Sequence, residues 1–169
     1  ILFGDGAGAA VVRAEEGELY PSVAGSDGTM GHVLACESRV QNDWQQKEAD
    51  RKTYIDMDGT AVFKFAVRKM PEMAKSLMTQ MHCTEADIDW FITHQANERI
   101  IEAIARRLKS DIAKFPMNIA ECGNTSSASI PILLDEMNRS GQLKDGQKII
   151  MAGFGAGLSW GAVYMEWHA

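Results

Sequence analysis

Two polar side chains lie where ligands gather in α/β proteins. His94 ends the apolar run 90–93 just before a helical pattern, and Asn124 lies in the turn 123–129, which precedes another helical pattern. Ligands bind outside the carboxyl ends of strands in open α/β sheets. A neutral imidazole and an amide can each offer an N–H to an oxygen that gains negative charge. The pair predicts carbanion chemistry at a thioester with the nucleophile supplied elsewhere, although each residue could instead cap a helix.

The Gly-rich stretch 153–157 follows a predicted strand and would let the backbone approach a ligand closely, or serve a tight crossing between strands. Two other Gly-rich segments fit known functional motifs, but the segments that follow them rule those motifs out. Residues 4–9 fit the dinucleotide pattern G-x-G-x-x-A, but a strand-like segment follows where that site needs a helix. Residues 157–161 fit the hydrolase pattern G-x-S-x-G, but a strand again follows, and only His168 lies beyond.

The three cysteines do not supply a convincing nucleophile. Cys122 lies two residues before Asn124, but Glu121 beside it raises the pKa of a thiol rather than lowering it. Cys36 and Cys83 have no activating neighbours in the sequence. The wide spacing lacks a C-x-x-C pattern, so neither a metal site nor a disulfide framework is expected. A reducing, cytoplasmic setting fits this usage best.

Alternating strands and helices must position these residues, so the sequence predicts an α/β fold. We predict strands over 7–14, 19–25, 54–58, 89–94, 148–152 and 162–167. Helical patterns begin at Thr60, continue as a second helix from Pro71, and recur over 97–109 and 126–138. Residues 26–52 are Gly-rich and then polar, and we expect a loop there.

The chain has 169 residues and a formal net charge of −6, from 17 Lys and Arg against 23 Asp and Glu. General nucleic-acid binders usually carry a basic face, so none is expected here. No apolar run of about 18 residues is present, and we expect no membrane span. The chain starts at Ile1 rather than Met, and we interpret it as a processed or truncated piece of a longer protein.

Five segments in order resemble β-ketoacyl-acyl-carrier-protein synthase III of the thiolase superfamily. They are Leu2-Phe3-Gly4-Asp5-Gly6-Ala7-Gly8-Ala9, Met57-Asp58-Gly59 with Val62-Phe63-Lys64, His94-Gln95-Ala96-Asn97 with Arg99-Ile100, Gly123–Ser129, and Gly153–Gly161. The resemblance is weakest across 36–52. It implies a thiolase-like α/β fold, layered αβαβα in the full protein, of which this chain is about one half. Residues 1–21 would end the N-terminal half, and 22–169 would form the C-terminal half.

The resemblance also implies the activity. Such enzymes take an acyl group from acyl-CoA onto a Cys and condense it with malonyl-acyl carrier protein, with loss of CO₂. That Cys lies in the N-terminal half, which is absent here, while His94 and Asn124 match the other two catalytic residues. Coenzyme A enters as a thioester substrate, and no cofactor or metal is implied. Four further residues would line the site and its pantetheine channel: Gly59, Phe63, Asn97 and Phe154.

An acidic carrier protein requires a basic patch on an acidic enzyme, and Lys64, Arg99, Arg106 and Arg107 are the candidates. Arg99 and Arg106 share a helix face, although an ordinary solvated face with a Glu102–Arg106 pair is the alternative. A homodimer of the full protein is also implied. Two other functions remain open: a related thiolase-fold acyltransferase of secondary metabolism, and a non-catalytic structural half.

Overall fold

A four-stranded mixed sheet forms the centre of the computed structural model, which describes residues 3–11, 16–36 and 54–168. Its strand order is β1-β6-β5-β4, with β1 at Ser22–Ser26, β4 at Trp90–Thr93, β5 at Lys148–Gly155 and β6 at Ser159–Glu166. β6 pairs antiparallel with both β1 and β5, whereas β4 pairs parallel with β5. A separate antiparallel ribbon consists of β2, Leu34–Cys36, and β3, Ile55–Met57.

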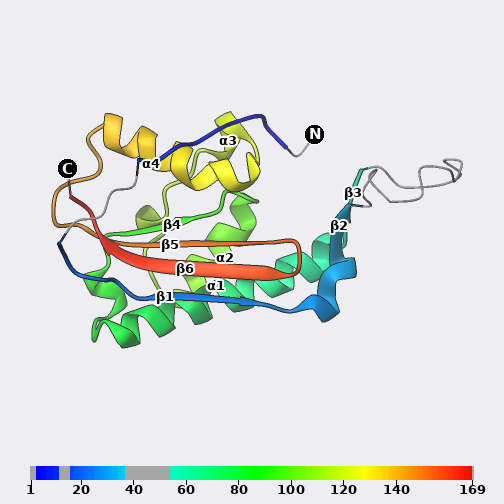
Figure 1. Ribbon diagram of the computed structural model, residues 1–169, viewed down its shortest axis with the longest axis horizontal. Coiled ribbons are helices and arrows are strands. Elements are labelled where there is room, and N and C mark those ends of the chain that lie inside the picture. The colour runs from blue at the N-terminus through cyan, green and yellow to red at the C-terminus, as the bar shows by residue number, and fades with distance from the viewer. Residues whose placement is uncertain (1–2, 12–15, 37–53, 169) are drawn as a thin grey trace, which may run out of the picture.

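Helices cover both faces of this sheet (Figure 1). α1, Gly59–Gln80, and α2, Glu98–Leu108, pack on one face, while α4, Ser129–Arg139, packs on the other beside the short α3, Ile119–Cys122. Four 3₁₀ segments complete the described part of the chain: Gly28–Val33, Glu85–Asp87, Ile112–Lys114 and Ser126–Ala128. The β2–β3 ribbon stands at the end of the molecule where α1 begins.

Alternating side chains of β4 and β5 divide the core into two layers. Phe91 and Ile150 join the cluster under α1 and α2, whereas Ile92 and Ile149 join the cluster under α4. All four side chains are buried. Because the strands are covered on both faces, they read as continuous apolar runs, which explains why the sequence located them well.

Pro71 does not start a second helix, and that prediction is wrong. α1 runs unbroken from Gly59 to Gln80 with Pro71 buried inside it. Proline lacks the N–H that would bind the carbonyl of residue 67, which normally weakens a helix interior. Here the Nη1 of Arg107, from α2, donates to the Val67 carbonyl oxygen at 3.2 Å. A side chain from a neighbouring helix thus satisfies the carbonyl that Pro71 leaves free.

Two further predictions need correction. Residues 7–11 form no strand, and 12–14 lie outside the described residues. The segment crosses α3 and α4, where Gly4, Gly6 and Gly8 lie too close to Cys122, Ile132 and Pro131 for a Cβ. Among the described residues, its backbone pairing is limited to the isolated Phe3–Asn124 bridge, and no strand pairs with it. Part of the expected loop 26–52 is structured, as the 3₁₀ helix and β2, because Val33 packs with the N-terminal part of α1.

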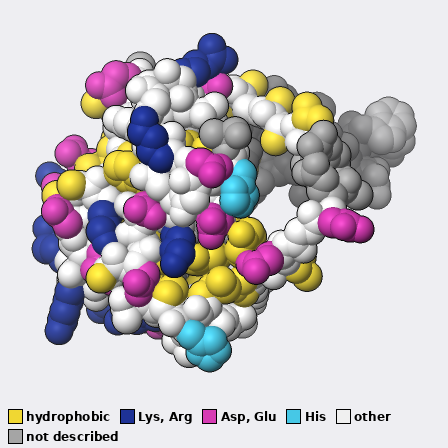
Figure 2. All heavy atoms as spheres, turned by 90° about the vertical axis from the view of Figure 1, so that its left-hand side faces the viewer, with side chains coloured by type: hydrophobic (Ala, Val, Ile, Leu, Met, Phe, Trp, Pro, Cys, Tyr) yellow, Lys and Arg dark blue, Asp and Glu magenta, His cyan; other side chains and the backbone are white. Residues whose placement is uncertain are grey.

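The surface carries charges of both signs close together. Figure 2 shows Lys and Arg side chains interspersed with Asp and Glu on the face that lies at the left of Figure 1. Local pairs contribute to this pattern, such as Arg139 with Asp135 at 2.7 Å and Arg68 with Glu72 at 3.9 Å. In the described part of the chain, no helix is long and apolar enough to cross a bilayer.

Candidate active site

His94 lies at the carboxyl end of β4. Its backbone N–H donates to the Ala152 carbonyl oxygen of β5 at 2.9 Å, which continues the parallel pairing by one residue. The ring Nδ1 lies 2.7 Å from the Ser129 Oγ of α4. Burial lowers the pKa of His94, so the ring is neutral at pH 7. Asn97 caps α2 by accepting the N–H of Arg99 at 2.9 Å, so the alternative of a cap at His94 is wrong.

The loop that carries His94 is braced by the fully buried amide of Gln95. Its Nε2 donates to the Thr93 carbonyl at 2.9 Å and to the Pro116 carbonyl at 3.4 Å, and its Oε1 accepts the N–H of Asn118 at 3.3 Å. An unpaired buried amide would be costly, so these contacts fix the loop as well as satisfy the side chain. The backbone at His94 is therefore held from two sides.

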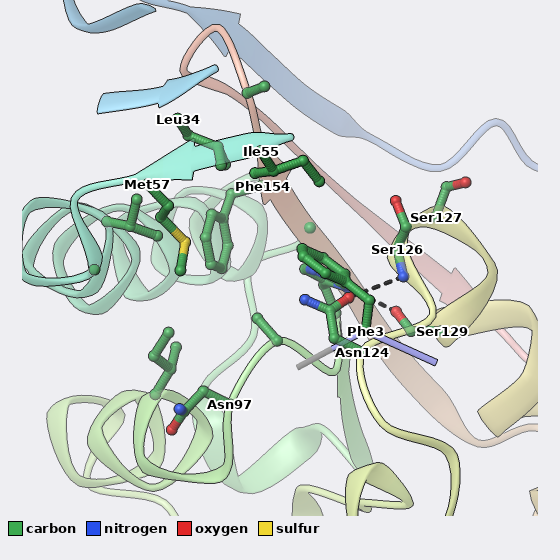
Figure 3. Close-up of a pocket in the computed structure, with 18 of the residues that line it drawn as sticks. Phe3, Leu34, Ile55, Met57, Asn97, Asn124, Ser126, Ser127, Ser129 and Phe154 are labelled. Atoms are coloured by element: carbon green, nitrogen blue, oxygen red, sulfur yellow. Dashed lines mark hydrogen bonds between the residues drawn. The ribbon is translucent and has the colours of Figure 1, made fainter. Parts of the chain in front are cut away.

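Asn124 lies in the turn between α3 and the 3₁₀ segment before α4. Gly123 precedes it with a φ of 68°, a conformation that favours glycine. The Asn124 Oδ1 accepts the Ser126 N–H at 2.9 Å, and its carbonyl oxygen accepts the Gly4 N–H at 3.0 Å. Figure 3 shows the amide oxygen turned toward Ser126. The amide nitrogen is consequently the group that Asn124 offers to the space in front of it.

His94 and Asn124 face one cavity of about 700 Å³. Its walls come from residue 3, the β2–β3 ribbon, the segment after β4, the starts of α1 and α2, the turn before α4, and the β5–β6 hairpin (Figure 3). The apolar part of the wall includes Phe3, Leu34, Ile55, Met57, Val62, Phe63, Ile100, Ile130 and Phe154. Two neutral N–H donors in apolar surroundings suit an oxygen that becomes negative during reaction.

The four residues predicted for the channel all line this cavity: Gly59, Phe63, Asn97 and Phe154. The Phe154 ring meets the His94 ring edge to face, with centroids 5.8 Å apart and an interplanar angle of 69°. Gly153 and Gly155 also line it, and the same stretch leads β5 into the hairpin with β6. The stretch therefore lines the cavity and also joins two strands, whereas close approach of its backbone to a ligand stays a prediction.

The four predicted docking residues are exposed and lie outside the cavity wall. Lys64 follows Phe63 on α1, and Arg99 is the second residue of α2. Arg106 pairs with Glu102 at 3.7 Å, as the alternative expected. Arg107 contacts α1 as described above. That these four residues form one docking surface stays a prediction.

Cys122 is a poor nucleophile in this structure. Burial, together with Glu136 and Glu121, raises the pKa of its thiol. It does not line the cavity, whereas Cys36, at the end of β2, does. Among the described residues, no group of three or more His, Cys, Asp or Glu could hold a metal ion.

Sequence reasoning missed several wall residues, notably Phe3, Cys36 and Ser129. Ser129 belongs to the turn motif that was noticed, but its contact with His94 joins positions 35 apart in the chain. The β2–β3 ribbon is short and partly polar, so nothing in its pattern indicated that it lines a cavity. No local signal in the sequence could have assigned these residues.

A mixed sheet covered by helices on both faces, with donors at the strand ends, places the chain in the thiolase-like class of α/β proteins. The structure superposes on the crystal structure of 3-oxoacyl-(acyl carrier protein) synthase III from Pseudomonas aeruginosa PAO1 with a TM-score of 0.80 and 36% identity. The alignment covers 95% of this chain and 47% of that chain. The predicted fold class is confirmed.

Residues 78–167 match the family described as 3-oxoacyl-[acyl-carrier-protein (ACP)] synthase III C terminal, and the chain belongs to this family. β-Ketoacyl-[acyl-carrier-protein] synthase III of Clostridium novyi (strain NT) is 45% identical over 170 residues, and that of Clostridioides difficile (strain 630) is 44% identical over 171. Each alignment covers 99% of this chain and 52% of the relative. The chain thus spans about half the length of the curated relatives it matches.

Proposed function

We propose that this chain is the C-terminal half of a decarboxylating condensing enzyme that initiates fatty-acid synthesis. The enzyme joins an acyl group from acyl-CoA to malonyl-acyl carrier protein and yields 3-ketoacyl-acyl carrier protein. The observation that carries the proposal is the pair of neutral donors, on His94 and Asn124, at one largely apolar cavity. The names of the relatives, β-ketoacyl-[acyl-carrier-protein] synthase III, support the same reaction.

The two donors act on the thioester oxygen of the malonyl group. When the bond to the malonyl carboxylate breaks, CO₂ leaves, and the remaining electron pair forms an enolate with its negative charge on that oxygen. The N–H groups of His94 and Asn124 stabilise this charge, and the apolar wall strengthens the interaction by excluding water. The enolate carbon then attacks the acyl thioester on the catalytic Cys of the other half, and the Cys leaves as a thiolate.

The proposal includes the partners that the reaction needs. In this proposal the N-terminal half carries the Cys and completes the site. Burial raises the thiol pKa of both Cys122 and Cys83, which makes them poor nucleophiles. The complete protein acts as a homodimer in the cytoplasm. Acyl-CoA and the malonyl carrier enter past Gly59, Phe63, Asn97 and Phe154, and the carrier docks on Lys64, Arg99, Arg106 and Arg107.

The test is decarboxylation and condensation of malonyl-acyl carrier protein by the complete protein. His94→Ala and Asn124→Ala should each lower both rates by about 10²–10³, since each removes one donor to the developing oxyanion. Acyl transfer from acyl-CoA should fall less. Cys122→Ser is the control and should leave both rates unchanged. A wild-type rate of decarboxylation in both alanine variants would refute the assignment of His94 and Asn124 as donors. A complete protein with neither decarboxylation nor condensation activity would favour a structural role.

A second function has one observation in its favour. The priming β-ketosynthase of the R1128 polyketide pathway superposes with a TM-score of 0.76 and 34% identity, and the alignment covers 87% of this chain and 44% of that chain. Such an enzyme would use the same two donors with a carrier protein of secondary metabolism. Competition between the two carriers for the complete protein distinguishes the functions, because the preferred carrier gives the larger kcat/KM.

A further inference from the structure

The buried hydroxyl of Ser129 contacts both the ring and the loop of His94. Ser129 is the first residue of α4, and only 1% of its surface is exposed. Its Oγ lies 3.2 Å from the backbone nitrogen of Gln95 and 2.7 Å from the Nδ1 of His94. The hydroxyl therefore lies between the loop after β4 and the ring that the loop carries.

The direction of these two hydrogen bonds follows from which of the groups carry a hydrogen and which can accept one. A backbone N–H can only donate, so the Ser129 oxygen accepts from Gln95. The hydroxyl has a single hydrogen, and Nδ1 of His94 is its one available acceptor within the described part of the chain. If Nδ1 carried the ring proton instead, the hydroxyl hydrogen would be buried without a partner, which folded proteins avoid. The Ser129 hydroxyl consequently donates to Nδ1.

The ring proton must then lie on the other nitrogen. His94 is neutral at pH 7 because burial lowers its pKa, so only one of its two nitrogens carries a proton. With Nδ1 accepting from Ser129, that proton is on Nε2, on the far side of the ring from α4. Since His94 lines the cavity, Nε2–H is the group that it can present to a ligand.

We propose that Ser129 is a positioning residue that holds His94 in the Nε2–H tautomer, so that the ring meets the substrate thioester oxygen as a hydrogen-bond donor and not as a base. This inference rests on the proposed function for the role of the donor, but not for the tautomer itself. The same turn sets the second donor, because the Ser126 N–H occupies Oδ1 of Asn124 and leaves its amide nitrogen for the ligand. Two serines three positions apart thus orient both donors.

Nitrogen NMR of the complete protein tests the tautomer without any activity. Long-range ¹H–¹⁵N correlations of ¹⁵N-histidine protein, assigned by comparison with His94→Gln, should show a protonated Nε2 and an unprotonated Nδ1 for His94 at pH 7. Ser129→Ala should increase the Nδ1–H population about three- to tenfold, as expected for the loss of one hydrogen bond. A protonated Nδ1 in the wild type, or an unchanged tautomer in Ser129→Ala, overturns the proposal. The wild-type spectrum alone determines the tautomer of His94, even if the Ser129→Ala variant does not fold.

Kinetics then test whether the tautomer matters for the reaction. Ser129→Ala should lower kcat for malonyl decarboxylation about three- to tenfold and leave KM close to wild type, because the hydroxyl orients a donor and only 1% of the Ser129 surface is exposed. Ser129→Thr keeps the hydroxyl and should restore the rate and the Nε2–H signal together. Ser140→Ala, at the other end of α4, removes an exposed serine hydroxyl that donates to a backbone carbonyl and should change neither. A shifted tautomer with a wild-type rate would refute the proposed function of His94 while leaving the tautomer assignment intact.

Discussion

Gly4 offers a direct test of how the N-terminal segment holds the candidate site. A methyl group at Gly4 would overlap the carbonyl oxygen of Cys122. Restoring a separation of 3.0 Å, the shortest that such atoms tolerate, requires the segment to retreat by about 1 Å. The same retreat lengthens the bond from the Gly4 N–H to the Asn124 carbonyl from 3.0 Å toward about 4 Å, where no hydrogen bond remains.

Gly4→Ala should therefore affect both stability and rate. Loss of the backbone hydrogen bond should lower the free energy of unfolding by about 1 kcal/mol. Because the Asn124 carbonyl loses this partner, the turn that carries the amide is held less precisely, and the rate of malonyl decarboxylation should fall by about 10- to 100-fold. Urea unfolding and CO₂ release by the complete protein measure the two effects.

Two glycines serve as controls for this experiment. A Cβ at Gly8 would overlap Pro131, but Gly8 has no hydrogen bond to Asn124, so Gly8→Ala should lower stability and leave the rate close to wild type. A Cβ at Gly28 meets nothing within 4 Å, so Gly28→Ala should change neither. An equal loss of rate in Gly4→Ala and Gly8→Ala would refute the argument that the Gly4 bond positions Asn124.

Two further predictions concern α1, α2 and the carrier surface. Arg99→Glu should lower kcat/KM for malonyl-acyl carrier protein and become milder as salt rises, while acylation by acyl-CoA stays unchanged, because screening weakens long-range attraction; Arg139→Glu, at the far end of α4 from the cavity, is the control. Arg107→Ala should lower the free energy of unfolding by about 1 kcal/mol. In a Pro71→Ala background that cost should shrink, since the restored N–H binds the Val67 carbonyl, and additive costs in a double-mutant cycle would contradict this.

The sequence predicted correctly those elements that are determined by residues close together in the chain. The helix expected over 97–109 is observed at Glu98–Leu108, because a strong apolar period and an Asn97 cap mark it within a few residues. The helix break at Pro71 was wrong because the carbonyl it frees is satisfied by Arg107, 36 positions later in the chain. The strand expected over 7–14 is not observed over its described part, 7–11, for a related reason, since an extended segment becomes a strand only where a neighbour pairs with it.

The candidate site shows the same division. His94, Asn124 and the channel residues could be named because each lies in a short motif at the end of a predicted element. Their orientation could not, since it depends on Ser129 for the ring and on Gly4 and Ser126 for the amide. A sequence motif indicates which groups are present, whereas the direction of each hydrogen bond depends on which distant segment packs against it.

In the described part of the chain, the hydrogen bonds that orient both donors come from this chain itself, and this separates two parts of the proposed reaction. His94 is oriented by Ser129 of α4, and Asn124 by its own turn and by Gly4. The nucleophile is different, because burial and two carboxylates raise the pKa of the Cys122 thiol. In the proposed enzyme, enolate formation thus uses donors that this chain supplies, whereas acyl transfer uses the Cys that this chain does not supply. Substitutions at the donors should consequently slow decarboxylation first, and substitutions at the missing Cys should abolish acyl transfer first.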